Sequence, residues 1–303
     1  MDLLYKAQTR FLFHAHIKIK ISAFYSDDIF DELFAVLENI DKKYNSYQAG
    51  SYFDLINKHS GIFVDVDDET IRILDKVIEL SNFFDGRYDI TIMPLIRLWG
   101  FYKDVQRTIP ASHEIERVKP LVNYQNIEIE QNKVRIAKNQ EIITASFIKA
   151  YAVDRLVEKM IQMGISDAII NAGGSTIRAI TNELHPTWSV IVRNSEDDEH
   201  LFSLDISNQC YSTSSQVKTF VDINGHRYGH ILNPKTGFPS EVKQVGIISD
   251  DCMIGDILST ALFNETKEGF IKKMNLLSAN YHVGGFMIDR DSEIVYTQGF
   301  LNP

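Results

Sequence analysis

The sequence of 303 residues contains only two cysteines, Cys210 and Cys252, and they do not form a Cys-x-x-Cys pair. A disulfide framework or a metal site built from cysteines is therefore not expected, and both thiols are interpreted as ordinary core residues. The formal net charge is −10, and no run of lysine and arginine stands out. Because nucleic-acid binding needs a basic surface, we expect no nucleic-acid partner.

A long apolar segment is also lacking, because no stretch of 18 apolar residues occurs. We therefore expect no membrane-spanning helix. Residues 1–13 contain neither a long apolar core nor a small-residue cleavage site, so a signal peptide is not expected. These features predict a cytoplasmic location for the chain as given, and an exported protein if a leader has been removed.

The chain has no internal repeat, low-complexity tract or long linker rich in proline and serine. With 44% hydrophobic residues it can bury a large core. We predict a single domain over residues 1–303, organised as one body or as two tightly joined lobes.

Hydrophobic periodicity predicts an α+β fold with mainly antiparallel sheets and packed helices. Residues 10–24 alternate strictly between apolar and polar, with Phe11 and Ile17 on one face, which predicts one half-buried strand. On its other face, His14 and His16 are either metal ligands or simply polar surface. Helices are expected at 26–44, 68–85, 146–163, 253–264 and 266–277, strands at 167–171, 187–193, 201–207, 217–223 and 243–249, and hairpins at 126–136 and 281–298. Because strands come in hairpins, with Asn224-Gly225 as one turn, a doubly wound sheet is disfavoured.

One predicted helix carries a carboxylate and a hydroxyl on the same face. Asp256 and Thr260 are four residues apart in the otherwise apolar segment 253–264. Polar groups on a buried helix need partners. They are expected either to bind a hard cation such as Mg²⁺ or to be satisfied by hydrogen bonds within the core.

A lysine lies near the start of another predicted helix. Lys149 follows Thr144 and Ser146, which are the expected N-cap candidates. A cation in the first turn opposes the helix dipole, whereas a bound phosphate would compensate for it. Lys149 is therefore either a phosphate ligand or an ordinary surface lysine.

Two further segments place polar groups in stiff turns. Asp89 and Thr91 follow the end of a predicted helix. There the Asp89 carboxylate is expected either to accept hydrogen bonds from its own turn or to bind a polar ligand. His230 precedes the segment "NPKTGFP", whose prolines and glycine fix the chain. Such a loop is suited to holding an imidazole in one place, although a histidine beside a turn is also a common structural feature.

Taken together and in order, these segments resemble the ApbE family of FAD:protein FMN transferases. The similar blocks span roughly residues 10–295 and are "YNSYQAGSYFDLIN", "GRYDITIMPLIRLWGF", "KAYAVD", "NAGG", "YSTSS", "HILNPKTGFP" and "DILSTALF". The resemblance implies two intertwined α+β lobes that bind FAD. It also implies Mg²⁺-dependent transfer of FMN from FAD to a Thr or Ser hydroxyl of an acceptor flavoprotein, with AMP as the leaving group.

The resemblance assigns a role to particular residues. Asp256 and Thr260 would bind Mg²⁺, with Ser146 near a third ligand position. Lys149 would contact the phosphates, and His230 would be the base that accepts the hydroxyl proton. The remaining FAD contacts implied by the family blocks are Tyr47, Tyr88, Asp89 and Thr236.

The sequence departs from the family pattern at several positions. An aspartate of the pattern falls on Ile143, and its Gly-Gly falls on Ala145-Ser146. Other differences are Phe13-His14-Ala15, Met93, Ala150, Ser215 and Asn233. We expect these changes to weaken FAD binding. Two alternatives are an FAD pyrophosphatase that yields FMN and AMP, and a flavin-binding protein with impaired catalysis.

Overall fold

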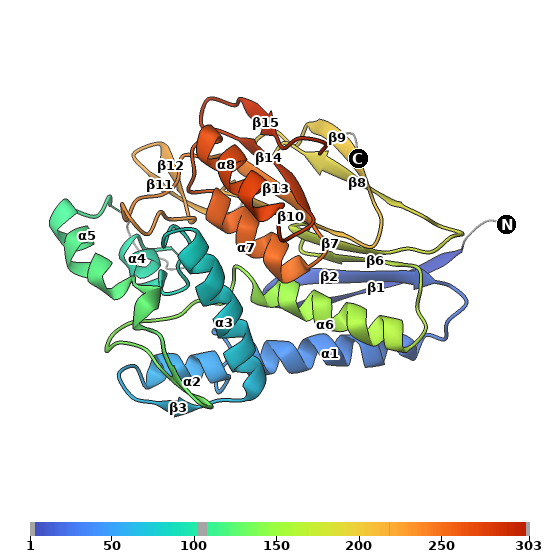
Figure 1. The fold of residues 1–303 in the computed structure, drawn as a ribbon, viewed down its shortest axis with the longest axis horizontal. Helices are drawn as coiled ribbons and strands as arrows, with labels where there is room; N and C mark the ends of the chain where they lie inside the picture. The colour runs from blue at the N-terminus through green and yellow to red at the C-terminus, as the bar shows by residue number, and fades with distance from the viewer. Residues whose placement is uncertain (1–3, 102–107, 218, 301–303) are drawn as a thin grey trace. The chain divides into compact units, whose positions relative to one another are not determined.

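The computed structural model describes residues 4–101, 108–217 and 219–300, and the chain divides into two compact units. Unit 1 consists of Met1–Lys42, Ser146–Ser214 and Lys243–Pro303, and unit 2 consists of Lys43–Ala145 and Ser215–Val242. The fold combines helices with mainly antiparallel sheets, as predicted (Figure 1). The expectation of one domain over residues 1–303 stays a prediction.

Unit 1 is built on an eight-stranded sheet with the order β1-β2-β6-β7-β10-β13-β14-β15. Pairs such as β2 with β6 and β13 with β14 are antiparallel. A separate hairpin pairs β8 with β9. The strands are β1 (Tyr5–Leu12), β2 (Ala15–Ser22), β6 (Ala168–Ala172), β7 (Thr176–Ile180), β8 (Trp188–Arg193), β9 (His200–Ile206), β10 (Cys210–Ser215), β13 (Gln244–Ser249), β14 (Val283–Ile288) and β15 (Ile294–Tyr296).

The helices that begin in unit 1 are α1 (Ile29–Tyr44), α6 (Ile148–Gln162), α7 (Cys252–Leu262) and α8 (Lys267–Leu277). Helix α7 packs against β13 and lies beside α6, and α8 packs against β14 (Figure 1). Nearly every residue of α7 is buried, including Asp256. A polar side chain on this helix must therefore find its partners inside the unit.

Unit 2 contains the short helices α2 (Tyr52–Lys58), α4 (Met93–Leu98) and α5 (Ser112–Val118), the longer helix α3 (Asp68–Phe83), and the 3₁₀ turns η1 (Lys119–Leu121) and η2 (Tyr124–Asn126). Its strands form a three-stranded sheet of β3 (Val64–Asp65), β5 (Lys133–Arg135) and β4 (Glu128–Glu130), and a hairpin of β11 (Phe220–Ile223) and β12 (His226–Gly229). One apolar cluster joins α4, α5 and this hairpin through Trp99, Ile115, Ile143, Val221 and Leu232.

The prediction of one strand over residues 10–24 is wrong, because the chain reverses at Phe13 and His14. Both residues have positive φ, 51° and 56°, and form the two-residue turn between β1 and β2. Apolar and polar residues keep alternating along the sequence through this turn. The turn nevertheless places Phe11 and Ile17 on opposite faces of the hairpin. Ile17 is fully buried, whereas Phe11 pairs with His16 and is 63% exposed.

Other predicted elements lie within a few residues of their observed positions. The turn Asn224-Gly225 joins β11 and β12, with both residues at positive φ. Strands β7 and β10 were not predicted. The predicted N-cap of α6 is also wrong, because Phe147 occupies that position and makes no side-chain capping hydrogen bond. Within residues 4–101, 108–217 and 219–300, no helix is long and apolar enough to cross a bilayer.

Candidate functional site

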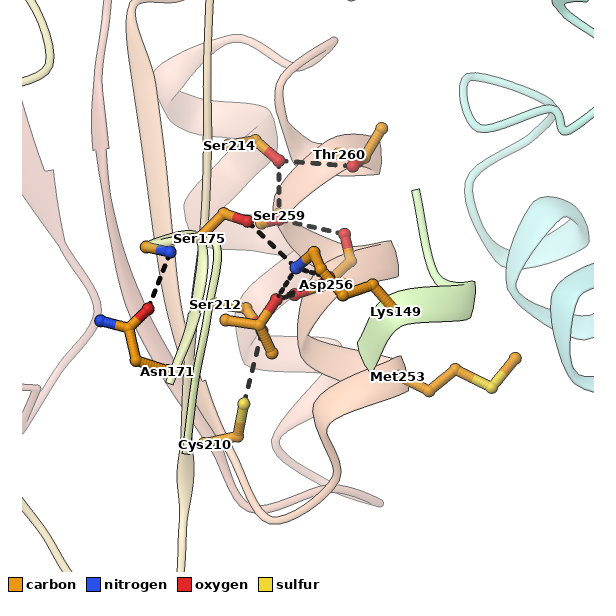
Figure 2. Close-up of polar contacts among 12 residues, drawn as sticks. Lys149, Asn171, Ser175, Cys210, Ser212, Ser214, Met253, Asp256, Ser259 and Thr260 are labelled. Carbon is orange, nitrogen blue, oxygen red and sulfur yellow. Dashed lines mark hydrogen bonds and ion pairs between the residues drawn. The ribbon is translucent and has the colours of Figure 1, made fainter. Parts of the chain in front are cut away.

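The carboxylate of Asp256 is the centre of a polar cluster inside unit 1 (Figure 2). Helix α7 begins at Cys252 and carries Asp256 one turn further, where it is 8% exposed. The hydroxyl of Thr176, at the start of β7, donates to both carboxylate oxygens at 2.9 Å. A sheet strand thereby fixes the orientation of a carboxylate that comes from the helix above it.

Lys149 reaches the same cluster from the second residue of α6. Its ammonium group lies 3.5 Å from the Asp256 carboxylate and donates to the hydroxyls of Ser175, at 3.1 Å, and Thr176. The side chains of Lys149 and Asp256 are 12% and 11% exposed. The interpretation of Lys149 as an ordinary surface lysine is therefore wrong, because its charged end is in a buried ion pair.

Thr260 lies one turn beyond Asp256 on α7 and belongs to a second row of hydroxyls. Its hydroxyl is 3.3 Å from that of Ser214, which in turn is 2.8 Å from that of Ser259. Ser259 donates back to the Asp256 carbonyl at 3.0 Å. Ser146 lies in the turn before α6. Asp256 and Thr260 thus lie next to serine and threonine hydroxyls. The oxygen of a hydroxyl can bind a hard cation, and its O–H can donate a hydrogen bond to phosphate.

Burial raises the pKa of the Asp256 carboxyl, and the nearby Lys149 ammonium and the hydroxyls of Ser212 and Thr176 act in the opposite direction. The helix comes close enough for these contacts because residue 255 is glycine. A Cβ there would lie 2.7 Å from the Ser212 hydroxyl and 2.5 Å from that of Ser249. The close packing of α7 on β10 and β13 therefore requires this glycine.

The donor set is suited to a metal that is completed by substrate. Among the residues that the structure describes, no three His, Cys, Asp or Glu side chains come together as a metal cluster. Mg²⁺ is commonly held by one or two carboxylates together with substrate phosphates and water. One carboxylate, Asp256, with hydroxyl oxygens beside it fits that pattern.

A second carboxylate, Asp154, anchors the first turn of α7. It accepts the backbone N–H groups of Cys252 and Met253 at 2.9 and 2.8 Å, while Asp251 accepts that of Ile254 at 2.7 Å. Burial and the neighbouring Asp251 raise the pKa of Asp154 to about 7. The acid of the "KAYAVD" block therefore holds the helix that carries Asp256.

His230 lies in unit 2, directly after β12. Its Nδ1 is 3.0 Å from the carbonyl of Thr219, and because a carbonyl only accepts, Nδ1 carries the proton. The lone pair then resides on Nε2. Burial lowers the pKa of His230 below its usual 6.5, opposed by the hydrogen bond to Thr219. At neutral pH the imidazole is thus in the form that can accept a proton.

The loop after His230 is closed by its own hydrogen bonds. Asn233 receives the N–H of Gly237 at 2.8 Å and donates its own N–H to Phe238 at the same distance. The carbonyl of Gly237 accepts the indole N–H of Trp99 at 2.8 Å. The backbone of this loop is therefore tied to the apolar cluster of unit 2, and its role in positioning the imidazole of His230 stays a prediction.

The other predicted FAD contacts of unit 2 differ in accessibility. Asp89 is 6% exposed and both its oxygens bind locally, one to Thr91 and one to the N–H of Tyr124. Tyr88 is also buried, at 4%. Thr236 is exposed and its hydroxyl accepts the N–H of Phe238. Asp89 thus satisfies its own turn, the first of the two expectations, and contact of these residues with FAD stays a prediction.

Tyr47, which is 43% exposed, lines a polar cavity of about 570 Å³ in unit 2. Other lining residues are Asn57, Arg97, Gln140, Glu141 and Ile143. Asn57 makes two hydrogen bonds to the backbone of Ile142, and Arg97 pairs with Glu141 through two nitrogens. These hydrogen bonds hold the polar side chains of the cavity wall in place.

Several site residues were not predicted from the sequence. Thr176, Ser212, Ser214 and Ser259 surround Asp256 or Thr260, and all lie inside or beside the "NAGG", "YSTSS" and "DILSTALF" blocks. These residues could have been found from the many serine and threonine residues in segments that are otherwise apolar and buried. Buried hydroxyls indicate partners even when the partner lies far away in the sequence.

Relatives of this chain share one name, FAD:protein FMN transferase. A relative from Vibrio cholerae, named FAD:protein FMN transferase, is 24% identical over 238 residues, which covers 76% of this chain and 71% of the relative. A relative of the same name from Escherichia coli K12 is 29% identical over 189 residues, 59% of this chain and 54% of that protein.

Solved structures show the same fold. The ApbE protein of Thermotoga maritima matches with a TM-score of 0.89 at 23% identity, covering 99% of this chain and 100% of that one. The flavin transferase ApbE of Vibrio cholerae matches with a TM-score of 0.83 at 21% identity and 99% coverage of both chains. The sequence model described as "ApbE family" matches residues 13–281, and over that length this chain belongs to the ApbE family.

Proposed function

We propose that this protein transfers FMN from FAD to a Thr or Ser hydroxyl of an acceptor flavoprotein, with AMP as the leaving group and Mg²⁺ as the cofactor. The observation that carries the proposal is the buried Lys149–Asp256 pair beside a row of hydroxyls. It occurs in a family whose curated relatives are named FAD:protein FMN transferases.

The chemistry is a phosphoryl transfer. The acceptor oxygen forms a bond to the phosphorus of the FMN half of FAD, the bond from that phosphorus to the bridging oxygen breaks, and AMP departs with that oxygen. Such reactions depend mainly on positioning and neutralisation of charge. When bound, Mg²⁺ would act as a Lewis acid that neutralises negative charge on the pyrophosphate oxygens.

The residues of the chain have separate tasks in this proposal. Asp256, with Thr260 and Ser146, would hold the metal, and Lys149 would bind phosphate oxygens as a point charge. His230 would take the proton of the acceptor hydroxyl on Nε2, since its other nitrogen donates to Thr219. The cavity lined by Tyr47 would bind a ring system of FAD.

The test uses purified protein, FAD, Mg²⁺ and an acceptor flavoprotein whose flavinylation motif contains the target Thr or Ser. Covalent flavin on the acceptor is detected by in-gel fluorescence and mass spectrometry, and AMP by chromatography. The controls are omission of the acceptor, excess EDTA, and an acceptor with alanine at the target hydroxyl.

The outcomes separate the candidate functions. Flavin on the acceptor together with AMP supports the proposal. Free FMN and AMP at the same rate with and without acceptor would instead identify an FAD pyrophosphatase. FAD binding without either product would identify a flavin-binding protein that lacks this catalysis.

A further inference from the structure

The cation nearest to the proposed metal ligand Asp256 is already part of the chain. The ammonium of Lys149 lies 3.5 Å from the carboxylate, and both side chains are almost nine-tenths buried. Thr176 links the two, since its hydroxyl donates to Asp256 and receives a hydrogen bond from Lys149. Carboxylate, hydroxyl and ammonium therefore form one closed cluster, in which Figure 2 shows Lys149 pointing towards Asp256.

This cluster conflicts with simple metal binding. A divalent cation at Asp256 needs the carboxylate oxygens towards which Thr176 and Lys149 are directed. The ammonium and the metal carry charges of the same sign, and their repulsion is strong where water is excluded. The two cations therefore compete for the same carboxylate, and the repulsion between them favours movement of the ammonium away from Asp256 when a metal binds.

The position of Lys149 favours such a movement once an anion is present. It is the second residue of α6, so its ammonium is near the positive end of a helix dipole. Its partners Ser175 and Thr176 lie at the adjacent start of β7. A flexible four-carbon stem allows the charged end to reposition without moving the helix.

We propose that Lys149 is the counter-ion of Asp256 in the metal-free protein and leaves the carboxylate when a divalent cation binds there. The inference rests on the proposed function in one respect, the assignment of Asp256 as a metal ligand. The released ammonium is then available to a diphosphate. Metal and FAD therefore bind with positive coupling, because each needs the ion pair to open.

The first experiment measures metal binding without FAD, using Mn²⁺ as the probe in calorimetric titrations at pH 8. Alkaline pH limits competition by protons, since burial raises the pKa of Asp256. Lys149→Met should bind Mn²⁺ at least about 5-fold more tightly than the wild type, the lower end of common coupling factors. The matched control is Lys159→Met, which removes an ion-paired lysine at the last turn of the same helix and should leave the affinity unchanged.

The second experiment uses the wild-type protein, so it does not depend on the folding of a variant. The protein is treated with a limiting amount of acetylating reagent, and the acetylated fraction of each lysine is measured by mass spectrometry, with Lys159 as the internal reference. Lys149 should react slowly without metal, several-fold faster with saturating Mg²⁺, and slowly again when FAD is added with Mg²⁺.

Three results would overturn the inference. They are equal or weaker Mn²⁺ binding by a folded Lys149→Met, acetylation of Lys149 that does not respond to bound Mg²⁺, and absence of Mn²⁺ binding to both proteins. None of these measurements requires FMN transfer. An opened ion pair in a protein that does not flavinylate acceptors would therefore refute the proposed function alone, whereas transfer with an unresponsive Lys149 would refute this inference alone.

Discussion

Substitution of Gly237 by alanine should test why the loop after His230 is built as it is. Gly237 has φ of +77°, a region in which a side chain is strained. A Cβ at this position would lie 2.5 Å from Cγ2 of Ile115, inside the apolar cluster that also contains Leu95. Two separate penalties therefore act on the variant, one in the backbone and one in the core.

The expected loss in the free energy of unfolding is the sum of these two penalties. A non-glycine residue in the left-handed region costs about 1–2 kcal/mol. Forcing an extra methyl group into a packed core costs about 1–3 kcal/mol. We therefore expect Gly237→Ala to lower the free energy of unfolding by about 2–5 kcal/mol, if the two penalties add.

A matched control separates the contributions. Gly50 belongs to the same unit and has φ of +85°, but a Cβ there meets no heavy atom within 4 Å. Gly50→Ala should therefore show the backbone penalty alone in urea unfolding followed by circular dichroism. If Gly237→Ala is no less stable than Gly50→Ala, the proposed clash with Ile115 does not exist and the reasoning fails.

Four further predictions concern the site and the fold. Asp256→Ala should lose Mg²⁺ binding and FMN transfer, and full transfer by this variant or by wild type in excess EDTA would contradict the metal assignment. His230→Ala should slow single-turnover transfer by at least about 10²-fold with FAD affinity retained. Because burial lowers the pKa of His230, the wild-type rate should begin to fall only at a lower pH than an exposed imidazole would give. Ile143→Asp should destabilise the protein by about 2 kcal/mol or more, since Ile143 is 7% exposed and packs in an apolar cluster at the wall of the cavity lined by Tyr47. An unchanged melting temperature with tighter FAD binding in calorimetry would show that this side chain belongs to the cavity and not to the cluster. Replacing Phe13-His14 by Asn-Gly should raise the free energy of unfolding by about 1–2 kcal/mol by relieving two positive-φ residues, and a decrease would show that these side chains stabilise the turn by other contacts.

The sequence predicted those elements whose signal is local. Periodicity located α7 and α8 within a residue or two, and Asn224-Gly225 marked the turn between β11 and β12. It failed at Phe13-His14, because the apolar–polar alternation of the sequence runs through the turn, and Phe-His lacks the Asn, Asp or Gly that usually marks a two-residue hairpin turn.

The polar cluster shows a different limit. Asp256 and Thr260 were predicted from their spacing on one helix, which is a local property. That Lys149 and Thr176 would reach the same carboxylate depends on packing between α6, α7 and β7, which no local pattern encodes. The hydrogen bond from His230 to Thr219 is likewise a product of the hairpin between them.

The order of strands in the unit 1 sheet has a consequence for biosynthesis. Strand β2 pairs with β6, so Ile17 meets Ala172 only after roughly 150 further residues have been synthesised, on the order of 10–30 s at common translation rates. During that interval the backbone edge of β2 that pairs with β6 is open, in a strand that also carries Ile17, Ile19 and Ile21, which are fully buried in the finished sheet. Lys18 and Lys20 alternate with them and charge the strand. Such lysines oppose edge-to-edge association of nascent chains, so their replacement by neutral β-formers should reduce soluble yield even where the mature protein is unchanged.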